Sequence, residues 1–201
     1  MQSVIPVVMR KPPLRAERTE TTMQAEMHPL EPFFQQMVRN SYAGKLGIHD
    51  ADITRYVAHL LCEFSESEKL YKVRDEAGHP VYSLEEMVVA ADPVHGTASS
   101  FDAERTVRKH IGDYALFISG MYPESMDPWR RRHGQQSFEE LVKVGKESYY
   151  IVSQFDVEEY ADEAPMFARL SEWFDRCIYG LRLVRDDLTR ARPGFLPASV
   201  H

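Results

Sequence analysis

Apolar residues recur every three or four positions along most of the chain, which is the spacing of one face of an α-helix. The stretch 99–122 is the central example, and its apolar stripe consists of Val107, Ile111, Tyr114, Ile118 and Met121. The second half of this stretch is apolar on most sides, and a helix of that kind is normally buried. We therefore predict that a helix over residues 99–122 forms the centre of the fold, ending before Pro123.

The same spacing predicts further helices before and after the central one. Their expected starts carry prolines or capping residues, namely Pro29 or Pro32, Asp50 or Asp52, Ser83 and Ser137. The last helix is expected over residues 165–190, where an unbroken apolar seam contains Phe167, Leu170, Phe174, Cys177, Leu181, Val184 and Leu188. Together these patterns predict an all-α fold, an irregular bundle of five or six helices.

Residues 70–82 depart from the helical pattern. Short apolar segments flank a turn-forming sequence that ends at Gly78, which is typical of a small β-hairpin. Pro80 has no N–H group to donate to a strand pair, which favours an ordered loop instead. Both alternatives remain open for this segment.

The remaining segments define the expected domain organisation. Residues 28–190 should form a single helical domain, and residues 191–201 a C-terminal tail. Residues 1–27 contain three prolines and no sustained apolar period, so we expect a flexible N-terminal arm. The alternative is an arm that packs its apolar residues onto a partner subunit, and these are Val4, Ile5, Val7 and Val8.

Composition narrows the class of protein. Of 201 residues, 43% are hydrophobic and 27% are charged, which is typical of a globular chain. The net charge of −7 disfavours a nucleic-acid partner or an anionic membrane surface, because phosphate groups attract basic surfaces. Cys62 and Cys177 are too few for a disulfide framework, so we expect reduced thiols and a cytoplasmic location.

One pair of residues on the central helix is our candidate for a catalytic site. His110 and Asp113 lie one turn apart at the edge of the apolar stripe. A histidine oriented by a carboxylate suits a general base or a metal ligand. The alternative is a histidine at the core boundary with a single hydrogen bond, beside an Asp113 paired with Lys109.

Metal and cofactor sites have little support in the sequence. His59 and Glu63 lie four residues apart, but off the apolar stripe of their helix, so a solvated pair is expected and a metal pair is the weak alternative. The chain contains no Cys-x-x-Cys or His-Glu-x-x-His spacing and no glycine-rich phosphate loop. We therefore expect neither a metal nor a cofactor.

A basic cluster follows the central helix, and it consists of Trp129, Arg130, Arg131 and Arg132. Arginine presents a rigid fork of donors that fits carboxylates and phosphates. We predict that this cluster contacts a partner chain or an anion. The alternative is a solvated loop whose arginines pair with nearby carboxylates.

The absence of an assembled catalytic motif and the surplus of apolar residues favour a non-catalytic interaction or structural module. We expect this module to self-associate as a homodimer. The alternative is a ligand- or metal-binding bundle, or an enzyme, with a pocket beside His110. Gly145 and Ser148 on a neighbouring seam would leave space for such a pocket. We recognise no family motif in the sequence.

Overall fold

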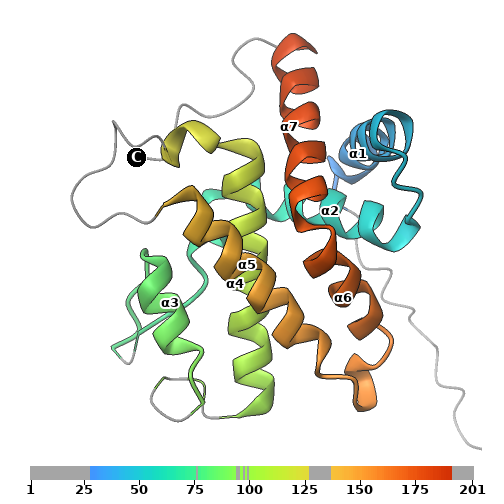
Figure 1. Ribbon diagram of the computed structural model, residues 1–201. Coiled ribbons are helices and arrows are strands. Elements are labelled where there is room, and N and C mark those ends of the chain that lie inside the picture. Colours follow the sequence, from blue (N-terminus) through green and yellow to red (C-terminus); the bar gives the residue numbers. More distant parts are fainter. Residues whose placement is uncertain are drawn as a thin grey trace, which may run out of the picture.

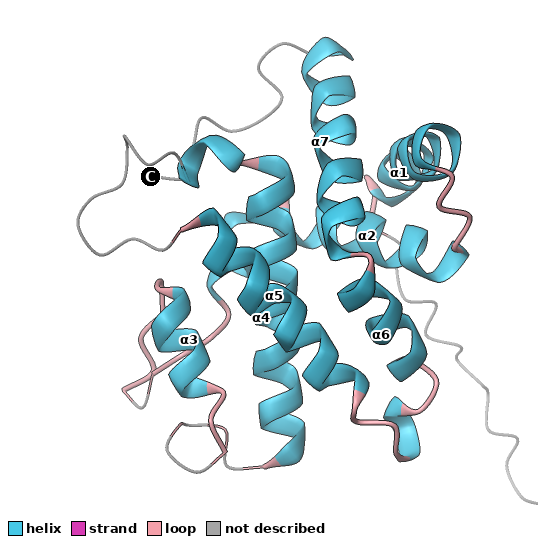
Figure 2. Ribbon diagram, in the orientation of Figure 1, coloured by secondary structure: helices cyan, strands magenta, loops and turns pink. Residues whose placement is uncertain are grey.

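The computed structural model describes residues 28–75, 77–93, 96, 98, 100–126 and 137–191, and every structural statement below concerns these residues. Their α-helices are α1 (Glu31–Leu46), α2 (Ala51–Phe64), α3 (Leu84–Ala90), α4 (Phe101–Met121), α5 (Phe138–Ser153), α6 (Ala164–Glu172) and α7 (Phe174–Ala191). Three short 3-10 helices accompany them, η1 (Ser67–Tyr71), η2 (Pro123–Met126) and η3 (Glu158–Tyr160). No strand occurs in the described ranges, so the predicted all-α class is confirmed (Figures 1 and 2).

Short polar side chains begin the helices, as the sequence predicts. The Asp50 carboxylate accepts hydrogen bonds from the first backbone N–H groups of α2. Ser83 and Ser137 do the same for α3 and α5. Such caps satisfy donors that have no partner within the helix. At the other end of α1, Gly47 adopts a left-handed φ of 65°, a conformation that glycine reaches without steric cost.

Helix α4 lies at the centre of the arrangement, with α5 crossing it and α7 packed alongside (Figure 1). Helix α6 packs on α5, while α1 packs on α2 and α7. Ile111, Leu116 and Ile118 of α4 are fully or almost fully buried. The predicted central position of this helix is therefore confirmed. Because α2 and α5 both pack on α4, residues of these two helices lie around it.

Glycine allows α4 and α5 to approach closely. A methyl group added at Gly145 of α5 would lie 2.7 Å from the Ala115 Cβ of α4 and 2.5 Å from the Phe174 ring of α7. A methyl group at Gly112 of α4 would lie 2.5 Å from the ring of Tyr149. The space at Gly145, which a pocket would need, is therefore filled by Ala115 and Phe174.

The predicted number of five or six helices is wrong, because the expected rod over residues 165–190 consists of two helices. The backbone leaves the helical conformation at Trp173, where φ is −97° and ψ is 18°. All seven residues of the predicted seam are nevertheless buried. The bend at Trp173 lets α6 pack on α5 while α7 turns to α1 and α4, which one straight helix could not do. The apolar spacing continues unchanged through the bend, so the sequence pattern does not reveal where one helix ends and the next begins.

The predicted hairpin at residues 70–82 reduces to a single antiparallel bridge between Arg74 and Pro80. The Val81 N–H donates to the Val73 carbonyl at 2.9 Å, and Gly78 supplies the left-handed residue of the turn with φ 82°. Since Pro80 cannot donate, the pairing does not extend into strands. Beyond η1, the described residues of this segment form an ordered loop, which was the alternative prediction.

Other predictions concern parts of the chain outside the described residues. These are the N-terminal arm, most of the C-terminal tail and the basic cluster from Trp129 to Arg132. Among the helices that the structure describes, none combines the length and apolar character needed to cross a lipid bilayer.

Candidate functional site

A buried polar network surrounds Asp113 of α4, which is only 3% exposed. Its Oδ1 atom accepts hydrogen bonds from the hydroxyl groups of Tyr56 on α2 and Tyr149 on α5, the latter at 2.7 Å. Its Oδ2 atom accepts a hydrogen bond from the Lys109 ammonium group at 2.8 Å. A buried carboxylate is tolerated when several donors satisfy it in this way. The network therefore ties three helices together at one carboxylate.

The three donors of this network, Tyr56, Tyr149 and Lys109, keep their protons at neutral pH. Burial raises the pKa of the Tyr56 and Tyr149 hydroxyls well above the ordinary value, and the negative charge of Asp113 raises both further. Burial acts to lower the pKa of Lys109, but the charge and hydrogen bond of Asp113 outweigh it, so this pKa is raised. Two neutral hydroxyls and one ammonium group thus donate to Asp113, and none of them titrates near neutrality.

His110 is buried one turn before Asp113 on α4 and does not form a hydrogen bond with it. Its Nε2 atom lies 3.1 Å from the Leu70 carbonyl oxygen. A carbonyl only accepts hydrogen bonds, so Nε2 carries the proton and donates it. The imidazole ring also packs edge-to-face on Phe64, with 5.9 Å between ring centroids. His110 therefore anchors η1 to α4.

Burial lowers the pKa of His110, although the charge of Asp113 opposes this change. The unfolded chain therefore binds more protons than the folded protein below the unfolded histidine pKa of about 6.5. Stability is consequently lost as the pH falls through that value, and it rises again as the pH increases. His110→Gln retains an N–H donor for the Leu70 carbonyl. We predict that this variant flattens the dependence of the unfolding free energy on pH between about pH 5 and 7.

The control for this prediction is His49→Gln, because His49 is exposed. Urea denaturation at a series of pH values measures both variants. His49→Gln should keep the slope of the parent protein. An unchanged slope in His110→Gln would contradict the prediction.

Sequence reasoning found Asp113 but not its tyrosine partners. The expected ion pair between Lys109 and Asp113 is present, whereas Tyr56 and Tyr149 lie 57 and 36 positions from Asp113 in the chain. One signal was available. A carboxylate within the apolar half of α4 needs several donors, and tyrosine is an aromatic core residue that supplies one.

The weak metal candidate is a surface pair. His59 Nε2 lies 3.9 Å from Glu63 Oε1, and the His59 side chain is 57% exposed. The same Glu63 oxygen accepts a hydrogen bond from Lys72 at 3.1 Å. Across the described part of the chain, no three histidine, cysteine or acidic side chains gather closely enough to hold a metal ion.

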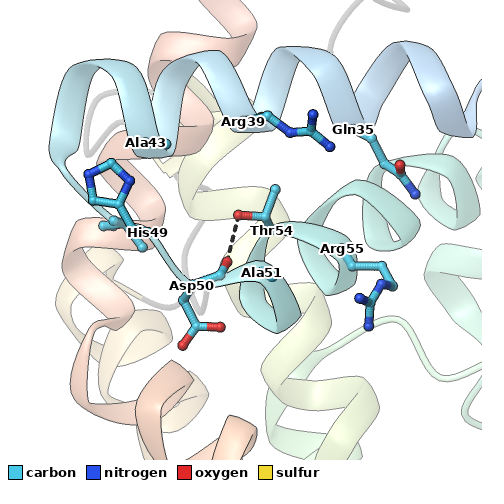
Figure 3. A pocket seen from close by; sticks show the side chains of 9 residues that line it. Gln35, Arg39, Ala43, His49, Asp50, Ala51, Thr54 and Arg55 are labelled. Carbon is cyan, nitrogen blue, oxygen red and sulfur yellow. Dashed lines mark hydrogen bonds between the residues drawn. The ribbon is translucent and has the colours of Figure 1, made fainter.

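Two cavities open along α2. The first has a volume of about 440 Å³ between α1 and α2, and its lining contains Gln35, Arg39, Ala43, Ile48, His49, Asp50, Ala51, Thr54 and Arg55 (Figure 3). The Asp50 carboxylate points away from α1 in this view. It accepts a hydrogen bond from Arg169 at 2.6 Å. Burial acts to raise the pKa of Asp50, but the N–H of Ile53 and the charge of Arg169 lower it overall. The remaining charged groups, Arg39 and Arg55, suit an anion.

The second cavity has a volume of about 410 Å³ and the opposite charge. Its lining contains Glu31, Asp52, Arg55, Tyr56, His59, Asp162, Glu163 and Met166. Carboxylates dominate this set, so it suits a cation. His110 lines neither of the two cavities.

An apolar cluster is exposed where α4 begins and α5 ends. The ring of Phe101 is 79% exposed and lies 6.3 Å from the ring of Phe155. Val157, two residues further on, is 61% exposed. Carboxylates flank these three residues. We call the whole set the end surface, consisting of Phe101, Phe155, Val157, Asp102, Glu104, Asp156 and Glu159.

The backbone beneath the end surface is held in place by polar contacts. The Tyr160 hydroxyl donates to Asp102 at 3.0 Å, and this carboxylate raises the pKa of Tyr160 to about 12. The Arg105 guanidinium group lies 3.8 Å from the centre of the Tyr160 ring and bonds Glu163 at 2.6 Å. These contacts join the start of α4 to the segment before α6, so Phe101 is presented from a fixed backbone.

Comparisons with protein-family models, curated proteins and solved structures found no match to this chain.

Proposed function

We propose that this protein is a non-catalytic helical module that acts through protein contacts and associates with a second copy of itself. The end surface carries this proposal. An aromatic ring that is 79% exposed beside a second ring and an exposed valine forms an apolar cluster. Contiguous exposed apolar patches with a polar rim are a mark of sites that contact a protein, a membrane or a ligand. Aromatic residues are also the usual anchors of protein interfaces.

The interior supports the same proposal, because the candidate catalytic groups form hydrogen bonds that hold parts of the fold together. Asp113 accepts three hydrogen bonds from Tyr56, Tyr149 and Lys109. His110 is bonded to the Leu70 carbonyl instead of a carboxylate. A general base needs a free lone pair within reach of a substrate proton. His110 keeps a lone pair on Nδ1, but His110 is 6% exposed and Asp113 is 3% exposed, so neither lies within reach of a substrate in solvent.

The nature of the partner follows from charge. Carboxylates surround the apolar cluster, and the whole chain carries a net charge of −7. Both features favour a protein partner over a nucleic acid or an anionic membrane. We also propose a cytoplasmic location, because Cys62 and Cys177 are free thiols, both buried.

The alternative function, ligand or metal binding beside His110, receives no support from the two cavities. Both open along α2 and neither is lined by His110. The seam position Gly145, which was expected to leave space, is in close contact with Ala115 and Phe174.

The mass of the full chain in solution tests the proposal. Light scattering at micromolar concentration should give twice the 23.2 kDa of one chain. Phe101→Ser should give a single-chain mass with an unchanged circular dichroism spectrum, because the ring contributes little to the core. Tyr179→Ser is the matched control. It removes an aromatic side chain that is 54% exposed on α7, and it should remain a dimer.

A wild-type protein that stays at the mass of one chain would overturn the proposal. A Phe101→Ser variant that dimerises as strongly as the parent would show that the end surface is not the interface.

A further inference from the structure

The end surface is too acidic to pair with itself. Residues 100–104 and 153–163, which build it, contain no lysine or arginine. The next basic residue along the chain, Arg105, is 7% exposed and is already bonded to Glu163. Two end surfaces facing each other would bring like charges together, which opposes association. The segment that covers this surface must therefore combine apolar side chains with positive charge.

We propose that residues 4–15 of a second copy of this chain cover the end surface. This inference rests on the proposed self-association and names the segment responsible for it. The segment reads VIPVVMRKPPLR and contains no acidic residue. Its apolar half would contact Phe101, Phe155 and Val157. Its basic half, with Arg10, Lys11 and Arg15, would face the surrounding carboxylates.

The reach of the chain is sufficient for this contact. The 12 residues that link Arg15 to His28 span at most roughly 43 Å when fully extended. Helix α4, which has 21 residues, is about 31 Å long. The linker can thus span the length of α4, and in a two-fold dimer each copy would give and receive one segment.

Another basic segment, Trp129–Arg132, matches the end surface less well. It has one large apolar residue, and Glu124 and Asp127 precede it closely. It also connects the end of α4 to the start of α5, whereas Phe101 lies at the opposite end of α4. Its predicted contact with a partner chain or an anion stays a separate prediction. The charge-reversal experiment also tests this segment as an alternative occupant of the end surface.

Charge reversal in the full-length chain tests the proposal. The arm variant carries Arg10→Glu, Lys11→Glu and Arg15→Glu. The surface variant carries Glu104→Lys, Asp156→Lys and Glu159→Lys, which leaves the Asp102–Tyr160 hydrogen bond in place. Sedimentation equilibrium should show dimers at least about tenfold weaker for each variant than for the parent. A chain with all six substitutions should dimerise again.

An equimolar mixture of the arm variant and the surface variant distinguishes exchange between copies from contact within one chain. In the arm variant, residues 4–15 and the end surface are both acidic, whereas in the surface variant both are basic. The mixture should therefore form a dimer that neither variant forms alone. If the segment binds its own chain, the mixture would stay monomeric, and the proposal would be overturned.

Two further variants control for total charge and for the competing loop. Arg39→Glu, Lys143→Glu and Arg190→Glu match the charge change of the arm variant at exposed positions elsewhere, and this chain should remain dimeric. The chain with Arg130→Ser, Arg131→Ser and Arg132→Ser should also remain dimeric.

The failures of the two proposals are distinguishable. In one outcome the parent and the arm variant both dimerise, while the surface variant is monomeric. Residues 4–15 would then not be the segment that covers the end surface, and the proposed function would stand. If the loop variant alone loses the dimer, the loop is the occupant. A monomeric parent would overturn the proposed function itself, and the further inference with it.

Discussion

Asp113→Ala should destabilise the protein by about 3–5 kcal/mol, because it removes one acceptor that three donors share. The hydroxyl groups of Tyr56 and Tyr149 would lose their common acceptor in the interior. Each unsatisfied buried donor costs about 1–3 kcal/mol. Lys109 contributes less, because its side chain is 32% exposed and can turn to water. Urea denaturation followed by circular dichroism measures the loss.

Matched variants separate the hydrogen bonds from the volume of the side chain. Tyr149→Phe should cost only about 1 kcal/mol, because Tyr56 and Lys109 still satisfy Asp113. The triple variant Asp113→Leu, Tyr56→Phe and Tyr149→Phe removes both hydroxyl donors with the acceptor, and the remaining donor, Lys109, is 32% exposed and can turn to water. It should therefore be more stable than Asp113→Ala. An Asp113→Ala protein within about 1 kcal/mol of the parent would show that the network contributes little.

Gly145→Ala should destabilise the protein by about 1–3 kcal/mol, although alanine is the better helix former. The new methyl group would lie 2.7 Å from the Ala115 Cβ, which is bonded directly to the α4 backbone and moves only if the helix moves. The Phe174 ring, at 2.5 Å, is fully buried and has no free space to enter. Thermal denaturation should show a fall in Tm of several degrees for a chain of this size.

Gly44→Ala is the control for helix propensity. Gly44 lies inside α1, and an added methyl group would have no neighbour within 4 Å. This variant should gain up to about 1 kcal/mol. The opposite signs of the two substitutions would confirm that α4 and α5 approach through Gly145. A Gly145→Ala protein as stabilised as Gly44→Ala would contradict the close contact.

Local patterns in the sequence predicted much of the fold. The apolar stripe with Ile111 and Ile118 identified the central helix, and Asp50 and Ser83 marked where helices begin. These features depend on neighbours within a few residues, so they can be read from the chain alone. The bend at Trp173 could not be found in this way, because the apolar period is the same on both sides of it.

The candidate site depended on contacts between distant parts of the chain. The hydrogen bonds of Tyr56 and Tyr149 to Asp113 arise only when α2, α4 and α5 pack together. The exposure of Phe101 is likewise a property of the packed fold, since a phenylalanine at the start of an apolar helix is expected in the core. The sequence therefore indicated which residues carry polar chemistry, but not which of them are buried by partners or left at the surface.

The most direct test of the central claim, self-association through the end surface, is hydrogen–deuterium exchange of the full chain at a high and a low protein concentration. Amides in residues 98–106 and 153–163 should exchange more slowly in the concentrated sample, because association would cover them. Amides of α3 and of residues 176–190 should exchange at the same rate in both samples. Light scattering establishes that the concentrated sample is dimeric. Equal exchange at residues 98–106 and 153–163 in the two samples would then contradict self-association through the end surface.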